Sequence, residues 1–258
     1  MQITFYHWGY QCPIIAEMLE LFQEAAMDDV TCIDITGQEK LAFEKQLYYP
    51  FLTIFNQQLH WYGPVTAAVL KGVRDGAITR EKPYVIEQSY EEKRGELLPL
   101  TSETLALTAK GCTLCADCAQ MKKKSDFLSS CGLTTFGFIH QLEGQIVGGV
   151  EWMPSLQVPY PIPKDAHTAF LTCVYHSSEE ADYKAWPLQC MEKELFKTYR
   201  RILVICDENS TFPNGTKDWF ERQGYCDLGL IQVLDGYARL HLLEKKRIIW
   251  DEGSIRYL

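Results

Sequence analysis

Four cysteines lie close together in the middle of the chain and carry the side chains best suited to bind a metal ion. Cys112, Cys115 and Cys118 are three residues apart, and Cys131 follows after twelve more residues. Four thiolates are the number that a tetrahedral zinc ion or an iron–sulfur cluster requires. On one helix the first three would spread over about 120° of arc, so one metal would contact two or three of them without local unwinding. The cluster therefore indicates bound zinc or an iron–sulfur cluster, redox-active thiols, or ordinary packing.

The composition is that of an ordinary globular protein with a sizeable core, because 47% of the 258 residues are hydrophobic and 23% are charged. The formal net charge of −9 argues against broad binding of nucleic acid or an anionic membrane. The N-terminus shows no signal-peptide pattern, and no apolar run approaches ~18 residues. We therefore expect a cytoplasmic protein with reduced thiols, no nucleic-acid partner and no membrane partner.

Periodicity in the first 80 residues predicts a small sheet with helices packed on it. Strands are expected at 3–6, 29–35, 51–56 and 57–61, and helices at 13–24, 38–46 and 65–73. The polar, charged stretch 81–94 then predicts a linker between a domain at 1–80 and a second domain at 95–258.

Two short motifs in the first domain carry a resemblance to a known fold. The segment Cys12–Ile15 (CPII) stands where the first helix should begin, and Tyr49–Pro50 directly precedes the third strand. Residues 1 to about 76 resemble the thioredoxin and glutaredoxin fold. That family has a cis-proline just before its third strand, where Pro50 stands in this chain. The resemblance implies that Cys12 attacks as a thiolate, stabilised by a helix N-terminus. Ile15 replaces the resolving cysteine, which leaves one-cysteine chemistry with glutathione, or a structural or binding module.

The second domain is expected to contain a larger mixed sheet flanked by helices, which makes the whole chain α/β (α+β). A hairpin is predicted about the Glu143-Gly144 turn, with strands at 133–141 and 145–152. The other expected elements are strands at 95–100, 169–175, 201–207, 226–234 and 238–244, and helices at 101–110, 186–199 and 217–223.

Three stretches of the second domain resemble the GNAT superfamily of acyl-CoA-dependent N-acyltransferases, in particular its YoaP-like members. They are Gly149–Pro154 (GVEWMP), Phe170–Tyr175 (FLTCVY) and Asp218–Tyr225 (DWFERQGY). The resemblance implies that acetyl-CoA is the cofactor and that a small-molecule or peptide amine is the acceptor. It also implies that the cofactor lies between two parting parallel strands, with its pyrophosphate on the N–H groups of a helix N-terminus.

The cofactor site implied by the resemblance departs from the family pattern in its pyrophosphate loop. Tyr183 stands where a glycine is expected, and Glu179, Glu180 and Asp182 bring negative charge. Two like charges about 5 Å apart cost about 1 to 3 kcal/mol, enough to weaken phosphate binding about tenfold. The residues expected to line the site are Cys173, Val174, Tyr175, Ala181, Tyr183, Lys184 and Ala185.

Acyl transfer also requires a base for the amine and a proton donor for the thiolate leaving group. The family pattern offers Tyr225 near the end of the chain for this chemistry. Glu151, at the end of the central strand, is the candidate base, and a solvated carboxylate on an edge or loop is the alternative for it. Cys12 would help to hold or reduce a substrate. Two alternatives remain open: a non-catalytic protein that keeps the fold and binds another ligand or a metal, and a thiol-transfer protein in which Cys12 is catalytic.

Overall fold

The structure is a computed structural model that describes residues 1–24, 29–83, 85, 87–110, 118–209, 214–251 and 254–257. Contacts within the chain divide it into two compact units. The first unit comprises Met1–Tyr84, Asp117–Gly132 and Pro159–Pro161, and the second comprises Val85–Ala116, Leu133–Val158 and Ile162–Leu258. Among the described residues, no helix is long and apolar enough to cross a membrane.

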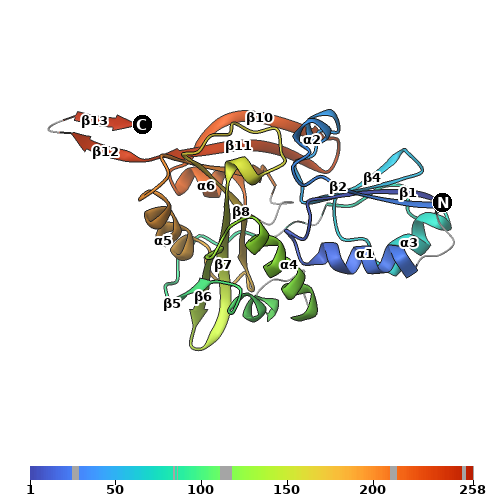
Figure 1. Cartoon of the computed structure of the whole chain (residues 1–258), viewed down its shortest axis with the longest axis horizontal. Coiled ribbons are helices and arrows are strands. Elements are labelled where there is room, and N and C mark those ends of the chain that lie inside the picture. Colours follow the sequence, from blue (N-terminus) through green and yellow to red (C-terminus); the bar gives the residue numbers. More distant parts are fainter. Residues whose placement is uncertain are drawn as a thin grey trace. The chain divides into compact units, whose positions relative to one another are not determined.

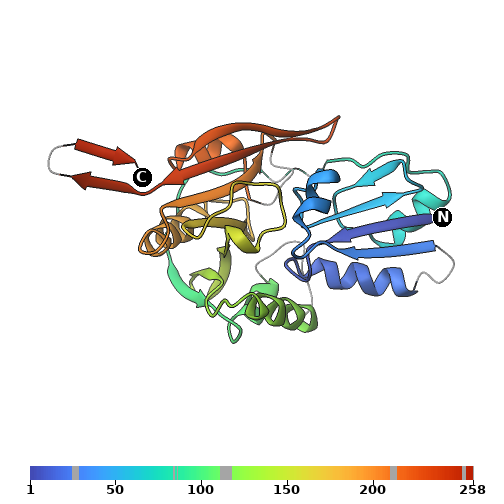
Figure 2. The ribbon, with the colours of Figure 1, turned by 45° about the horizontal axis from the view of Figure 1, so that its top comes forward.

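The first unit is built on a four-stranded sheet with the strand order β2-β1-β3-β4 (Figure 2). β1 pairs with β2 in parallel and with β3 antiparallel, and β4 pairs with β3 antiparallel. This confirms the small N-terminal sheet, although the peptide bond before Pro50 is trans. The elements are β1 (Gln2–His7), α1 (Ile14–Glu24), β2 (Asp29–Asp34), α2 (Glu39–Glu44), β3 (Phe51–Phe55), β4 (Leu59–Trp61), α3 (Ala67–Arg74) and α4 (Cys118–Ser130).

Helix α1 packs on this sheet through an apolar face. Ile15, Met18 and Phe22 recur at intervals of three and four residues, which places them on one side of the helix. They are buried in one cluster with Ile3 and Phe5 of β1. The core therefore fixes the start of α1, and with it the position of the segment that carries Cys12.

The second unit is built on a seven-stranded mixed sheet with the order β10-β11-β9-β8-β7-β6-β5 (Figure 1). Only β8 and β9 run parallel; the other neighbouring strands are antiparallel. The predicted larger mixed sheet is confirmed. The elements are β5 (Glu96–Leu100), η1 (Leu105–Lys110), β6 (Gly137–Leu142), β7 (Gln145–Pro154), η2 (Ser155–Gln157), β8 (Thr168–His176), α5 (Ala185–Leu195), β9 (Arg201–Asp207), α6 (Lys217–Arg222), β10 (Cys226–Leu234), β11 (Ala238–Lys246), and a terminal hairpin of β12 (Ile248–Asp251) and β13 (Ser254–Tyr257).

Turn chemistry decides two local features of this unit. Glu143 and Gly144 have φ angles of 51° and 76°, as a tight β6–β7 hairpin turn requires, so the predicted hairpin is confirmed. The helix expected over 101–110 is instead a 3₁₀ helix that starts at Leu105. The Thr104 hydroxyl donates to the Pro99 carbonyl at 2.6 Å and accepts the Thr101 N–H at 2.8 Å, which holds the preceding residues in a turn.

Helices α5 and α6 share one buried cluster with the central strands. Leu188 of α5 and Trp219 of α6 are fully buried against residues that include Val174 of β8 and Val204 of β9. This packing fixes the N-terminus of α5 near the end of β8, where the candidate site lies.

Candidate functional site

The two parallel strands at the centre of the larger sheet separate partway along their length. β8 and β9 are paired from Thr168↔Arg201 to Leu171↔Val204, and no pairing between them continues beyond this point. On its other side, β8 pairs with β7 through Leu171 and then Cys173, so Thr172 is an extra residue between two register positions. Such a bulge bends the strand that contains it. The separation therefore has a local cause in β8.

A buried asparagine bridges the two separated strands. Asn214 is fully buried; its Oδ1 accepts the backbone N–H of Val174 in β8 at 2.9 Å. Its Nδ2 donates to the carbonyl of Ile205 in β9 at 3.0 Å. The amide thus satisfies a donor on one strand and an acceptor on the other, which sheet pairing would otherwise have satisfied.

The loop from β8 to α5 ends in a carboxylate that caps the helix. Asp182 is buried, and its Oδ1 accepts the N–H groups of Lys184 and Ala185, both at 3.0 Å. Its Oδ2 accepts the indole N–H of Trp219 at 2.6 Å. Negative charge is favoured at a helix N-terminus, where N–H groups lack helical partners. The place where an external anion would bind to α5 is therefore occupied by the chain's own carboxylate.

A buried lysine lies beside this carboxylate. The ammonium group of Lys184 donates to Gln88 Oε1 at 2.6 Å and lies 4.7 Å from the centre of the Trp219 ring. A Cβ at Gly215 would lie 2.9 Å from the Lys184 Nζ, so a glycine there leaves room for the amine. Burial lowers the pKa of Lys184 to about 8, although the charge of Asp182 acts in the opposite direction.

The low pKa of Lys184 predicts a rise in stability with pH. The unfolded chain, with a lysine pKa near its ordinary 10.5, binds this proton more tightly than the folded chain does. The free energy of unfolding should therefore increase between about pH 8 and pH 10, by about 1 kcal/mol per pH unit from this group. Urea denaturation across this range should show that increment in the wild type and not in Lys184→Met. Equal slopes in both proteins would contradict it.

The other residues expected in the cofactor loop are packed into the protein. Ala181 and Ala185 are fully buried beside the capping Asp182. Tyr183 is also buried, and its carbonyl accepts a hydrogen bond from His140 Nδ1 of β6 at 2.8 Å. Tyr183 therefore fixes the loop on the sheet. Cys173, Val174 and Tyr175 all lie on β8 beyond the separation from β9.

Glu151 is buried in the middle of the sheet. It lies on β7, is paired with Cys173 of β8 and Gly137 of β6, and is only 3% exposed. A carboxylate on a solvated edge was the alternative, and this burial excludes that reading. Glu151 is thus next to the segment of β8 that leaves β9.

Tyr225 belongs to the core on the helix-covered side of the sheet. Its ring lies 5.2 Å from the Phe220 ring, and Lys245 Nζ lies 5.4 Å from its centre. Burial, together with the charge of Glu192, raises the pKa of Tyr225 well above its usual range. A higher pKa makes this buried phenol a weaker acid than a solvated tyrosine.

Cys12, Cys118 and Cys131 belong to the first unit, whereas the candidate site belongs to the second. Cys12 is half-buried just before α1, in the first unit. Burial, and then the charge of an ionised Cys12, raise the pKa of Tyr160 in the same unit well above its usual range. Cys112 and Cys115 lie outside the described residues. Cys118 begins α4, and Cys131 is half-buried just after that helix, where burial raises its thiol pKa. Within the described part of the chain, no group of three potential metal ligands occurs.

Asp182 and Asn214 complete the site, and sequence reasoning assigned neither of these roles. The sequence predicts that Asp182 repels phosphate, whereas its carboxylate is buried and accepts two N–H groups at the start of α5. Asp182 lies four residues before the helix expected at 186–199, too far from it for the capping preference of aspartate to indicate this role. Asn214 lies three residues before α6, and the sequence there gives no signal for a bridge between two strands.

Solved structures of acetyltransferases are similar to about 60% of this chain. One is the ribosomal-protein-alanine N-acetyltransferase of Brucella melitensis, with 15% identity, a TM-score of 0.42, and coverage of 59% of this chain and 100% of the other. Another is an N-acetyltransferase of Staphylococcus aureus Mu50, with 12% identity, a TM-score of 0.43, and coverage of 60% and 99%. A third is a GNAT-family acetyltransferase of Streptococcus pneumoniae, with 12% identity, a TM-score of 0.42, and coverage of 58% and 99%.

These similarities concern shape, and TM-scores below 0.5 do not by themselves define a fold. The sequence matches no protein-family model, and the search of curated proteins finds no match.

Proposed function

We propose that the second unit is an acyl-CoA-dependent N-acyltransferase of the GNAT type that acts on a small-molecule or peptide amine. The observation that carries the proposal is the separation of β8 from β9 beyond Leu171 and Val204, on the strand that leads to the N-terminus of α5. Separated parallel strands leave backbone amides unpaired by the sheet, and an adjacent helix N-terminus supplies N–H donors for phosphate. The resemblance of Phe170–Tyr175 to the family's cofactor strand supports the same assignment.

Backbone N–H groups at the start of α5 and on β8 are suitable donors for the phosphates of acetyl-CoA, but the side chains of Asp182 and Asn214 already accept hydrogen bonds from them. The N–H groups of Lys184 and Ala185 already bind the Asp182 carboxylate, and Val174 N–H already binds Asn214. Acetyl-CoA, which supplies the activated acyl group when bound, must therefore displace both. We assign Glu151, next to the parting strand, to accept the proton of the acceptor amine, and Tyr225 to supply one to the leaving thiolate.

Calorimetric titration with acetyl-CoA tests this function in three proteins: the wild type, Asp182→Asn and Glu179→Gln. Asp182→Asn removes the competing charge at nearly constant shape and should strengthen binding about tenfold. Glu179→Gln is the matched control, because it removes the same charge from an exposed position in the same loop. It should change affinity less than twofold, since exposed charges are screened. Absence of binding at millimolar acetyl-CoA in both the wild type and Asp182→Asn would overturn the proposal.

The second candidate is a non-catalytic protein that retains this architecture and binds a different ligand. The specific observation in its favour is that Asp182 and Asn214 already satisfy the donors expected for acetyl-CoA, through internal hydrogen bonds of 3.0 and 2.9 Å. On this account the contacts are permanent structural features. Asp182→Asn should then fail to bind acetyl-CoA, which separates the two candidates in the same titration.

A further inference from the structure

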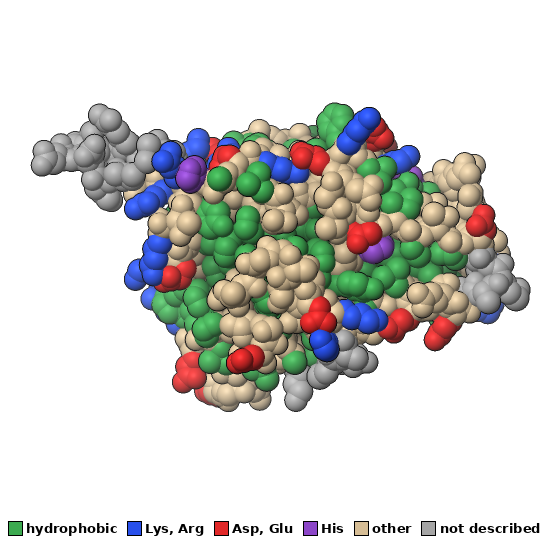
Figure 3. Space-filling view, viewed as in Figure 1, with side chains coloured by type: hydrophobic (Ala, Val, Ile, Leu, Met, Phe, Trp, Pro, Cys, Tyr) green, Lys and Arg blue, Asp and Glu red, His purple; other side chains and the backbone are tan. Residues whose placement is uncertain are grey.

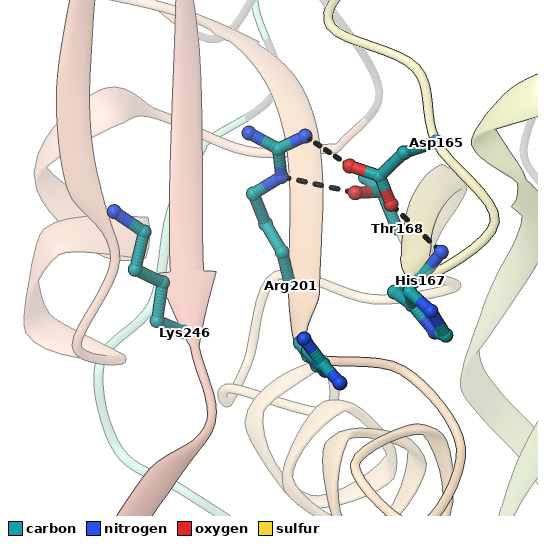
Figure 4. Close-up of a pocket in the computed structure, with 6 residues that line it drawn as sticks. Asp165, His167, Thr168, Arg201 and Lys246 are labelled. Carbon is teal, nitrogen blue, oxygen red and sulfur yellow. Dashed lines mark hydrogen bonds and ion pairs between the residues drawn. The ribbon is translucent and has the colours of Figure 1, made fainter. Parts of the chain in front are cut away.

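A second site lies at the opposite end of the parallel strand pair, where β8 and β9 begin. A pocket of about 240 Å³ opens there in the second unit (Figure 4). Its lining includes three basic side chains that come from the start of β9 and the end of β11. The lining residues are Asp165, His167, Thr168, Arg200, Arg201 and Lys246. The pocket shares no residue with the candidate cofactor site.

The guanidinium group of Arg201 is held in a fixed orientation in this pocket. Its Nε donates to Thr168 Oγ1 at 3.0 Å, and its Nη2 donates to Asp165 Oδ2 at 2.9 Å. Asp165 is itself fixed, because its other oxygen accepts the His167 N–H at 2.7 Å. The remaining terminal nitrogen of Arg201 faces the side of the pocket where Lys246 lies (Figure 4). One edge of a planar donor group is thus presented to a ligand.

Like charges face each other across the strands that form this pocket. Arg201 is the direct antiparallel partner of Lys246, and the backbone N–H of Arg247 donates to the carbonyl of Arg200 at 2.8 Å. Cross-strand pairs of like charge destabilise a sheet. The Lys246 Nζ lies 2.9 Å from Glu244 Oε1. Among the residues that line the pocket, Asp165 is the single carboxylate. Lys and Arg side chains are also frequent on the surface at this end of the second unit (Figure 3).

We propose that this pocket binds the phosphate group of a small phosphate monoester, held by the fork of Arg201 and by the charges of Lys246 and Arg200. A phosphate presents the paired oxygens that a guanidinium edge recognises, and its double negative charge offsets the facing cations. The volume of 240 Å³ exceeds what an inorganic phosphate needs and leaves room for a short organic group. Two of the three cations have one carboxylate partner each, Asp165 for Arg201 and Glu244 for Lys246, so the pocket keeps a local excess of positive charge.

Titration of the full chain with glycerol 3-phosphate at constant ionic strength tests the proposal, followed by calorimetry or by chemical-shift changes. Glycerol serves as the uncharged reference. Lys246→Gln should weaken glycerol 3-phosphate binding about fivefold. Lys197→Gln is the matched control, because it removes one exposed positive charge from the same unit outside the pocket, and it should change affinity less than twofold.

The variant Arg201→Lys tests whether the planar geometry of the guanidinium, in addition to its positive charge, is needed to bind the phosphate. It keeps the positive charge but loses the planar fork, so it should bind at least as weakly as Lys246→Gln, with urea denaturation confirming that the variant is folded. The proposal is overturned if glycerol 3-phosphate does not saturate the wild type, or if Lys246→Gln and Lys197→Gln bind it equally. Binding that is equally strong for glycerol would also overturn it. None of these outcomes depends on acetyl-CoA.

Discussion

Replacing Asp182 with alanine should lower the free energy of unfolding of the second unit by about 4 kcal/mol, because it leaves a buried charge and several buried donors without their partner. The carboxylate accepts two N–H groups at the start of α5 and the indole N–H of Trp219, and it lies beside the buried ammonium of Lys184. Urea denaturation followed by tryptophan fluorescence measures this loss. Glu179→Ala, in the same loop but exposed, should cost less than about 1 kcal/mol.

The same variant should respond to added anion. Because Asp182→Ala exposes the N–H groups of Lys184 and Ala185, inorganic pyrophosphate should restore part of its lost stability through binding to the folded state. The wild type should gain less, since its carboxylate occupies the donors. A loss below about 1 kcal/mol for Asp182→Ala, or equal stabilisation of both proteins by pyrophosphate, would show that Asp182 does not occupy an anion site.

Replacing Asn214 with alanine should lower the free energy of unfolding by about 3 kcal/mol, through two buried backbone groups left without hydrogen bonds. These are the N–H of Val174 and the carbonyl of Ile205, which lie on the separated strands β8 and β9. Asn209→Ala is the control, because Asn209 is exposed just after β9, and it should change stability by no more than about 0.5 kcal/mol. Equal effects of the two substitutions would contradict the bridging role of Asn214.

The regular elements of the second unit could be predicted because local chemistry and burial agree there. The β6–β7 hairpin follows from Glu143-Gly144 between apolar runs, and the apolar stretch Phe170–Tyr175 becomes the buried strand β8. The α-helix expected at 101–110 does not form, because the hydroxyl of Thr104 stabilises a turn before Leu105. The spacing of apolar residues carries no information about such a turn. Local hydrogen bonds of threonine competed successfully with helical propensity.

The candidate site was less predictable because it depends on contacts between distant parts of the chain. The bulge at Thr172 emerges only from the pairing of β8 with β7, and the Asn214 bridge joins residues 40 positions apart. Asp182 was predicted to repel phosphate from an open loop. Its hydrogen bond to Trp219, 37 positions away, makes it part of the core instead. The residue type of Asp182 therefore indicates its negative charge, but only the tertiary contacts show that this charge binds donors of the chain itself.

The indole N–H resonance of Trp219 provides the most direct test that acetyl-CoA binds at the parting of β8 and β9. This group donates to Asp182 Oδ2 at 2.6 Å, so any ligand that displaces the carboxylate must change its hydrogen bond. The resonance can be assigned with Trp219→Phe among the six tryptophans of the chain. We predict that saturating acetyl-CoA shifts the Trp219 indole resonance. Acetyl-CoA binding that leaves this resonance unchanged would contradict the account.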